Sequence, residues 1–246
     1  MIRIFDDLET LSQAAAEMFA DLANRAIVSH GRCSVALSGG HTPRRMYGIL
    51  ADAPFRDQIQ WQAIHVFWGD ERCVPLDDPR SNAQMARQIL LSHVPIPANH
   101  IHPIQGDLPA ALAAFNYETE LRDFFRDQTP IFDLILLGLG DNAHTASLFP
   151  HTPVLDEKER WVDEVYVAEQ HIYRVTLTAP LINQAKEVIF LVSGADKANA
   201  LQGVLEGAYQ PHDLPAQLIR PNGVHPIWLV DKAASHKLAV ETMEVA

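Results

Sequence analysis

The chain has 246 residues, of which 48% are hydrophobic and 20% are charged, and its formal net charge is −12. A chain of this length buries roughly 70–75% of the surface that its unfolded form exposes, and the apolar content excludes intrinsic disorder. The acidic charge argues against a nucleic-acid-binding protein, because such proteins carry a basic surface. A small anionic ligand is still allowed, since a positive pocket can lie in an acidic protein.

The N-terminus and the cysteines indicate a cytoplasmic protein. The segment Met1–Asp7 ends in two aspartates and lacks the apolar core of a signal peptide. No apolar run approaches the ~20 residues that span a bilayer, so we expect no association with membranes. The two cysteines, Cys33 and Cys73, are too few for a disulfide scaffold, and the sequence leaves open whether they lie close together.

In chain order, helix-like and strand-like segments alternate. Residues 8–29 form a predicted helix, because apolar residues such as Leu11 and Ala15 recur at spacings of three and four. A further helix is expected from Pro109, with Asp107 as its candidate cap. Four short runs are almost continuously apolar, as buried strands of a parallel sheet are: 33–37, 64–68, 132–137 and 188–192. The remaining predicted elements are helices at about 43–50, 81–91 and 195–205, and a strand at 227–230 that precedes a short helix.

This alternation predicts an α/β fold, with a doubly wound, mostly parallel sheet flanked by helices. Residues 162–178 differ, since strand-like stretches at 165–167 and 173–178 predict a small antiparallel excursion. The chain shows no long linker, low-complexity tract or repeat of 20–50 residues. We therefore expect a single domain over residues 1–246.

The four apolar runs share a feature at their ends, where each meets glycine with serine or aspartate beside it. In open α/β sheets the ligand site lies beyond the carboxyl ends of the strands. The sequence therefore predicts one crevice, built from residues 38–42, 69–72, 138–144 and 193–197.

The first of these segments, residues 38–42, reads Ser-Gly-Gly-His-Thr, is followed by Pro43, and joins a strand to a helix. We call it the glycine loop. Glycines let backbone N–H groups approach an anion, and a helix N-terminus carries partial positive charge, so the segment is a candidate phosphate cradle. A tight turn with a capping Ser or Thr explains the same residues equally well. A nucleophile elbow is disfavoured, because Ala36 stands where that motif needs glycine.

Charged and catalytic residue types follow two other strands. Asp70 and Arg72, with a glutamate between them, must meet water, each other or a ligand, and we favour a ligand over an internal ion pair. Gly138–Ala143 matches the loose dinucleotide pattern Gly-x-Gly-x-x-Gly/Ala, which is weak alone and falls in mid-chain. His144 comes next. A lone histidine is more often structural, but one in this crevice is a candidate general base.

Two cations lie near these loops. Arg174 is on a predicted strand, and Lys197 follows Ser-Gly-Ala-Asp. Each alone is typical of a solvated surface, whereas both beside a phosphate loop would form a cationic clamp. We expect Arg72 to join them, with Arg44 and Arg45 behind the glycine loop, in a small positive crevice. The remaining histidines show no metal-ligand spacing, so we assign no metal.

Together these segments resemble the 6-phosphogluconolactonase family, which has a sugar-isomerase-like α/β fold and includes glucosamine-6-phosphate isomerase/deaminase. The resemblance runs in the expected order over most of the chain. It is carried by residues 35–43, 67–82 (with Trp-Gly-Asp-Glu-Arg-x-Val-Pro), 136–150 (with His-Thr-Ala-Ser-Leu-Phe-Pro), 174–183, 190–197 and 214–217.

The resemblance implies hydrolysis of 6-phospho-D-glucono-1,5-lactone to 6-phospho-D-gluconate, with neither a metal nor an organic cofactor. It implies a small-molecule sugar phosphate lactone as the partner of a monomer or weak homo-oligomer. By similarity, His144 is the general base, and Asp70 and Arg72 line the sugar site. The phosphate side would comprise Ser38, Gly39, Gly40, His41, Thr42, Arg174 and Lys197.

One departure from the family lies beside the base. The family often has Asp-Gly-His where this chain has Asn142, Ala143 and His144. Asparagine accepts a hydrogen bond but supplies no charge to orient or strengthen the imidazole, and Asp141 is a candidate replacement. We therefore include Asn142 in the catalytic group, and the departure bears on the rate more than on the substrate.

Three other functions are compatible with the same residues. A glucosamine-6-phosphate isomerase or deaminase needs a base that moves a proton between C1 and C2, and Asp70 is a candidate. A nicotinamide-dependent dehydrogenase would use Gly138–Ala143. A non-catalytic sugar-phosphate binder is suggested by Asn142.

Overall fold

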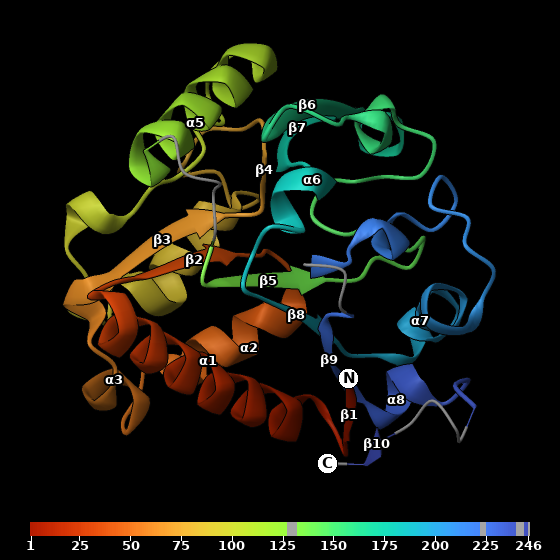
Figure 1. The fold of residues 1–246 in the computed structure, drawn as a ribbon, viewed down its shortest axis with the longest axis horizontal. Coiled ribbons are helices and arrows are strands. Elements are labelled where there is room, and N and C mark those ends of the chain that lie inside the picture. The colour runs from red at the N-terminus through yellow and green to blue at the C-terminus, as the bar shows by residue number, and fades with distance from the viewer. Residues whose placement is uncertain (127–131, 222–224, 240–243, 246) are drawn as a thin grey trace.

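A parallel sheet of seven strands organises the computed structural model, which describes residues 1–126, 132–221, 225–239 and 244–245 (Figure 1). The strand order is β10-β1-β9-β8-β5-β2-β3, and every neighbouring pair runs parallel. The predicted doubly wound, mostly parallel sheet is thus confirmed. Its strands are β1 (Ile2–Phe5), β2 (Cys33–Leu37), β3 (Ile64–Trp68), β5 (Leu134–Gly138), β8 (Glu187–Val192), β9 (Ile227–Asp231) and β10 (Glu244–Val245).

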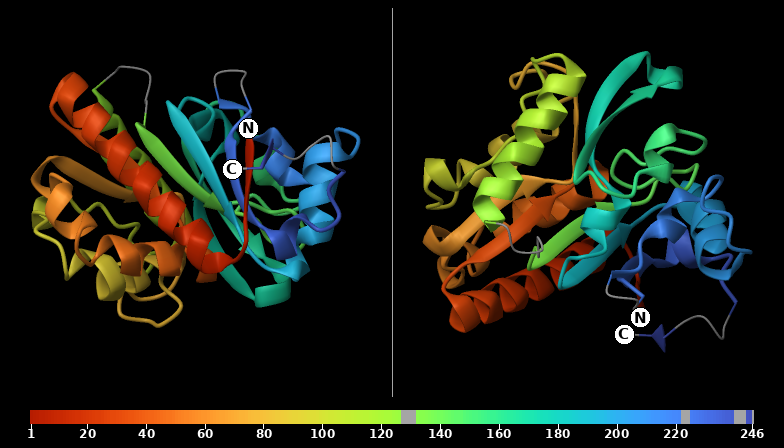
Figure 2. Two further views of the ribbon diagram at one scale, coloured as in Figure 1. Left: turned by 90° about the horizontal axis from the view of Figure 1, so that it is seen from below. Right: turned by 45° about the horizontal axis from the view of Figure 1, so that its top comes forward.

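Helices cover both faces of this sheet, which is why its inner strands are apolar on both sides. Helices α1 (Leu8–His30), α2 (His41–Leu50) and α3 (Phe55–Gln58) lie on one side of β2 and β3, and α5 (Ala110–Phe125) lies on the other (Figures 1 and 2). All five residues of β2 are buried. The shorter helices are α4 (Asn82–Ala86), α6 (Ala179–Ile182), α7 (Ala198–Glu206) and α8 (Lys232–Ser235).

Helix α1 shows how local signals set an element's ends. Asp7 is its N-cap and accepts a hydrogen bond from the Thr10 backbone, while the Thr10 hydroxyl accepts one from the Asp7 backbone. Gly31 ends the helix in the left-handed conformation, at φ 83°. The predicted helix over 8–29 is confirmed to within one residue.

A second sheet of three antiparallel strands stands beside the first. Strands β6 (Val162–Val167) and β7 (Ile172–Leu177) confirm the predicted antiparallel excursion. The third strand, β4 (Asp70–Arg72), has no apolar pattern and was not predicted. It forms because β7 supplies a partner, with Asp70 opposite Thr176 and Arg72 opposite Arg174. This pairing brings charged residues a hundred positions apart into one neighbourhood.

Some predicted boundaries were wrong. Asp107 does not cap α5, because the helix starts at Ala110 with Pro109 in the N-cap position and no side-chain cap. The strand expected from residue 132 starts at Leu134, since the carboxylate of Asp133 binds the backbone and hydroxyl of Ser34. The helix predicted over 81–91 is α-helical only to residue 86 and π-helical over 87–91. The helix predicted over 195–205 begins with a 3₁₀ turn at 195–197.

We infer that residues 1–246 fold as one domain. The buried apolar side chains of the described residues form one continuous cluster, which extends from Leu11 to Leu238 and includes Val165 and Val175 of the small sheet. Two sheets that share a core have no boundary at which few contacts cross.

The core predicts a clear contrast between two leucines. Leu136 on β5 is fully buried, whereas Leu112 on α5 is 46% exposed. We expect Leu136→Ala to lower the free energy of unfolding by about 2–5 kcal/mol, measured by urea denaturation. The control Leu112→Ala should change it by no more than about 0.5 kcal/mol. Equal effects of the two substitutions would contradict the assignment of β5 to the core.

Candidate active site

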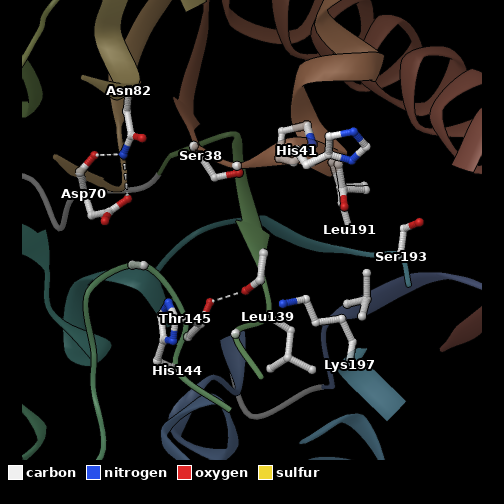
Figure 3. A pocket seen from close by; sticks show the side chains of 18 of the residues that line it. Ser38, His41, Asp70, Asn82, Leu139, His144, Thr145, Leu191, Ser193 and Lys197 are labelled. Atoms are coloured by element: carbon white, nitrogen blue, oxygen red, sulfur yellow. Dashed lines mark hydrogen bonds between the residues drawn. The ribbon is translucent and has the colours of Figure 1, made fainter. Parts of the chain in front are cut away.

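The carboxyl ends of β2, β5 and β8 and the small sheet surround a cavity of about 540 Å³. That volume is typical of a site for a small molecule. Figure 3 shows Asp70 and Asn82 on one side of it and His144 and Lys197 on others. The cavity brings together every predicted site residue except Asn142, namely Ser38, Gly39, Gly40, His41, Thr42, Asp70, Arg72, His144, Arg174 and Lys197.

The glycine loop carries free hydrogen-bond donors. Helix α2 starts at His41 and has no side-chain cap, so the alternative of a turn capped by Ser or Thr is wrong. Gly40 has a positive φ of 102°, which favours glycine. Within the described residues, neither the N–H of Gly39 nor that of Gly40 has a hydrogen-bond partner, and the Ser38 hydroxyl has none either. Such a loop at a helix N-terminus suits an anion.

Asp70 forms a buried ion pair with Arg174. Their side chains are only 7% and 6% exposed, and Arg174 Nη1 lies 3.4 Å from Asp70 Oδ2. The second nitrogen, Arg174 Nη2, donates to Gln170, and the guanidinium lies over the ring of Phe149. Arg174 therefore lines the cavity with its charge already partnered. Asp70, for which a ligand and an internal ion pair were the alternatives, makes the ion pair and also lines the cavity.

Sequence reasoning missed Asn82 and Ser147 as parts of this site. The Asn82 amide donates to the backbone carbonyl and Oδ1 of Asp70, at 2.9 and 3.1 Å, and its oxygen accepts from Arg72. The Ser147 hydroxyl donates to Asp70 Oδ2 at 2.6 Å. Asn82 also packs against the glycine loop, because a Cβ on Gly39 would lie 1.9 Å from its Oδ1. Both residues fall in motifs quoted above, but nothing in their spacing indicates these partners.

Asn142 sets the tautomer of His144. Asn142 Oδ1 accepts from the backbone N–H of His144 at 3.2 Å and lies 2.6 Å from His144 Nδ1. Because this oxygen can only accept, Nδ1 carries the ring hydrogen and Nε2 keeps its lone pair. The ring of Phe149 stacks on the imidazole, with centroids 4.1 Å apart. Asn142 thus acts from behind the base and not from the cavity wall.

Burial lowers the pKa of His144 to about 4. The nearby cations Arg174 and Lys197 act in the same direction, while Asp70 and Asp141 oppose them. The imidazole is therefore neutral at physiological pH, with an unprotonated Nε2.

Three cations line the cavity, as predicted, and two carboxylates lie among them. Arg72 and Arg174 are joined by Lys197, whose Nζ lies 2.9 Å from Asp196. With Asp70, this leaves one net positive charge in a protein of net charge −12. Arg44 and Arg45, expected just behind the loop, do not line the cavity.

The structure argues against a dinucleotide site. The segment 138–143 is followed by turns and not by the helix that a dinucleotide fingerprint requires, and Gly140 packs against the His144 ring. The described residues also contain no group of three or more His, Cys, Asp or Glu side chains that could hold a metal ion.

Comparison with known proteins identifies the family. Residues 6–228 match the family model described as glucosamine-6-phosphate isomerases/6-phosphogluconolactonase. The chain belongs to this family. It is 46% identical to a 6-phosphogluconolactonase of Synechocystis sp., over 87% of this chain and 88% of that one, and 39% identical to one of Nostoc sp., over 97% and 98%.

Solved structures agree with this assignment. The 6-phosphogluconolactonase of Trypanosoma brucei is 29% identical and superposes with a TM-score of 0.87, covering 97% of this chain and 98% of that one. A monomeric glucosamine-6-phosphate deaminase, 23% identical with a TM-score of 0.80 over 96% and 98% of the two chains, shares the fold.

The contact between Asn142 and His144 predicts the effect of restoring a carboxylate. Asn142→Asp keeps the acceptor but adds a negative charge next to the ring, which favours the imidazolium. We expect the pKa of His144 to rise by about 1–2, as measured by NMR titration of the ring. Asn116→Asp, half-buried on α5 and outside the cavity, is the matched control and should leave it unchanged. An unaltered pKa in Asn142→Asp would contradict the contact.

Proposed function

We propose that this chain hydrolyses 6-phospho-D-glucono-1,5-lactone to 6-phospho-D-gluconate. This is the activity of 6-phosphogluconolactonase, a lactone hydrolase of the oxidative pentose phosphate pathway, and the relatives from Synechocystis and Nostoc carry that name. The observation that carries the proposal is a neutral imidazole with a free Nε2, facing the same cavity as an uncapped glycine loop.

The loop and its helix are suited to the phosphate end of the substrate. The N–H groups of Gly39 and Gly40 are unpaired within the described chain, and the N-terminus of α2 adds partial positive charge. Lys197 extends its amine into the cavity (Figure 3) and neutralises the dianion. Arg174 was expected to bind the phosphate as well, but its pairing with Asp70 assigns it a longer-range electrostatic role in this proposal.

His144 then acts as general base. Its Nε2 takes a proton from a water molecule as that water attacks C1, while Nδ1–H stays on Asn142. Arg72 stabilises the negative charge that develops on the carbonyl oxygen. The C1–O5 bond breaks as the imidazolium returns its proton to O5, and the new carboxylic acid loses its own proton to solvent.

The environment of Asp70 favours this reaction over isomerisation or deamination. Both of its oxygens accept hydrogen bonds from protein groups, Oδ1 from Asn82 and Oδ2 from Ser147 and Arg174. A base for proton transfer between C1 and C2 needs a carboxylate oxygen free to face the sugar. Nε2 of His144 makes no hydrogen bond within the described residues and so is the available base. A non-catalytic binder would have no need of it.

Cytoplasmic location and a monomer or weak homo-oligomer complete the proposal. No helix among the described residues is long and apolar enough to cross a membrane. Cys33 and Cys73 are both free thiols, as a reducing compartment allows, although two rice relatives carry the designation chloroplastic.

The proposal is tested by removing the base. We expect His144→Ala to lower kcat by about 10²–10³-fold. The lactone is generated in situ by glucose-6-phosphate dehydrogenase, and 6-phosphogluconate is followed against a no-enzyme control, because lactones also hydrolyse unaided. His151→Ala, an exposed histidine in the same loop region, is the control. Activity of His144→Ala within threefold of wild type would remove His144 from the mechanism, and ammonia release from glucosamine 6-phosphate would favour the deaminase.

Two glycines near His144 test whether the position of its imidazole ring matters. A Cβ on Gly140 would lie 2.0 Å from His144 Nδ1, whereas one on Gly138 would meet nothing within 4 Å. We therefore expect Gly140→Ala to displace the ring and lower kcat by about 10²-fold. Gly138→Ala should retain most of the activity in the same assay. Similar rates for the two variants would show that the ring position is not critical.

A further inference from the structure

Two buried tyrosines bind the main chain at the ends of neighbouring strands. The Tyr47 hydroxyl donates to the carbonyl of Ser38 at 2.8 Å and accepts from its N–H at 3.1 Å. The Tyr117 hydroxyl makes the same two bonds to Trp68, at 3.2 and 2.8 Å. The two side chains are 0% and 2% exposed. One hydroxyl therefore satisfies both backbone groups of one residue in each case.

The Tyr47 hydroxyl holds the backbone of Ser38, the first residue of the glycine loop. Strand β2 ends at Leu37, so the N–H and carbonyl of Ser38 lie beyond the sheet ladder and need other partners. Tyr47 lies on α2, the helix that follows the loop, and its hydroxyl reaches back nine residues to Ser38. Burial raises the pKa of Tyr47 far above its usual value, so the hydroxyl keeps its proton and remains a donor.

The hydrogen bonds between Tyr47 and Ser38 determine which backbone N–H groups of the glycine loop remain unpaired. The N–H of Ser38 is engaged by Tyr47, which leaves those of Gly39 and Gly40 unpaired within the described residues. Gly40 holds its positive φ with open space around it, since a Cβ there would meet nothing within 4 Å. The conformation of the loop on this side thus depends on the Tyr47 hydroxyl and not on packing around Gly40.

We propose that Tyr47 is a positioning residue that sets the affinity of the loop for the substrate phosphate. The inference rests on the proposed function, since it takes the loop as the phosphate site. Tyr47 does not line the cavity, so it acts through the Ser38 backbone. A tyrosine that only stabilises the core would change the stability of the protein and leave phosphate binding intact.

Tyr117 supplies a matched control, because it makes the same pair of bonds, at the same burial, to a residue outside the loop. We expect Tyr47→Phe and Tyr117→Phe to lower Tm by similar amounts. Only Tyr47→Phe should raise KM for the lactone and the Kd for 6-phosphogluconate, measured by calorimetry, by about tenfold, with kcat within twofold of wild type. An increase in Kd no larger than that of Tyr117→Phe would overturn the proposal.

A second variant keeps the test open should Tyr47→Phe fail to fold. Gly40→Ala leaves Tyr47 in place and strains only the loop backbone, so it should reproduce the rise in KM and Kd. Unaltered binding would show that loop conformation does not set phosphate affinity.

Different results would overturn the proposed hydrolysis and the positioning role of Tyr47. A wild type that binds 6-phosphogluconate but hydrolyses no lactone above the control overturns the proposed function alone. A wild type that hydrolyses lactone, with both tyrosine variants alike in Kd, overturns the positioning role alone. A wild type that neither binds nor hydrolyses overturns both.

Discussion

The carboxylate of Asp70 joins the segments that form the site. It accepts hydrogen bonds from Asn82 at the start of α4, from Ser147 three residues after His144, and from Arg174 on the small sheet. Asn82 in turn touches the glycine loop at Gly39. Removing one partner of a buried ion pair typically costs about 3–5 kcal/mol, because the other charge is left unpaired. The geometry of the cavity therefore depends on a carboxylate that is held in place on all sides.

Positive and negative charges in the cavity nearly cancel, because a buried charge without a partner is costly. A phosphate dianion needs positive potential, but an unpaired buried guanidinium would be costly in its absence. Pairing the buried Arg174 with Asp70 avoids that cost, and in the proposed function Lys197, which is 25% exposed, and the loop N–H groups meet the phosphate. Backbone donors carry no net charge to desolvate, so a loop of glycines suits a binding site that is empty between turnovers.

The sequence was most informative where structure is local or periodic. The four apolar runs and the segment 227–230 predicted five of the seven strands of the main sheet. The glycines at the ends of the four runs predicted the cavity, because parallel strands all end at one edge. It failed where a partner lies far along the chain. Strand β4 exists only through its pairing with β7, and neither the role of Asn82 nor the pairing of Arg174 follows from neighbouring residues. Asn142 beside His144 was the exception, since a contact two residues away is visible in the sequence.

That contact gives a physical account of the departure from the family pattern. Burial already lowers the pKa of His144 to about 4, so the base is unprotonated without help. An aspartate at position 142 would pull the pKa back towards neutrality and make Nε2 a stronger base. Asparagine keeps the same tautomer of His144 but leaves its imidazole a weaker base. The imidazolium that forms during the reaction is therefore a stronger acid. A lactone suits this exchange, because its carbonyl is already reactive and its ring oxygen must be protonated in the step that follows.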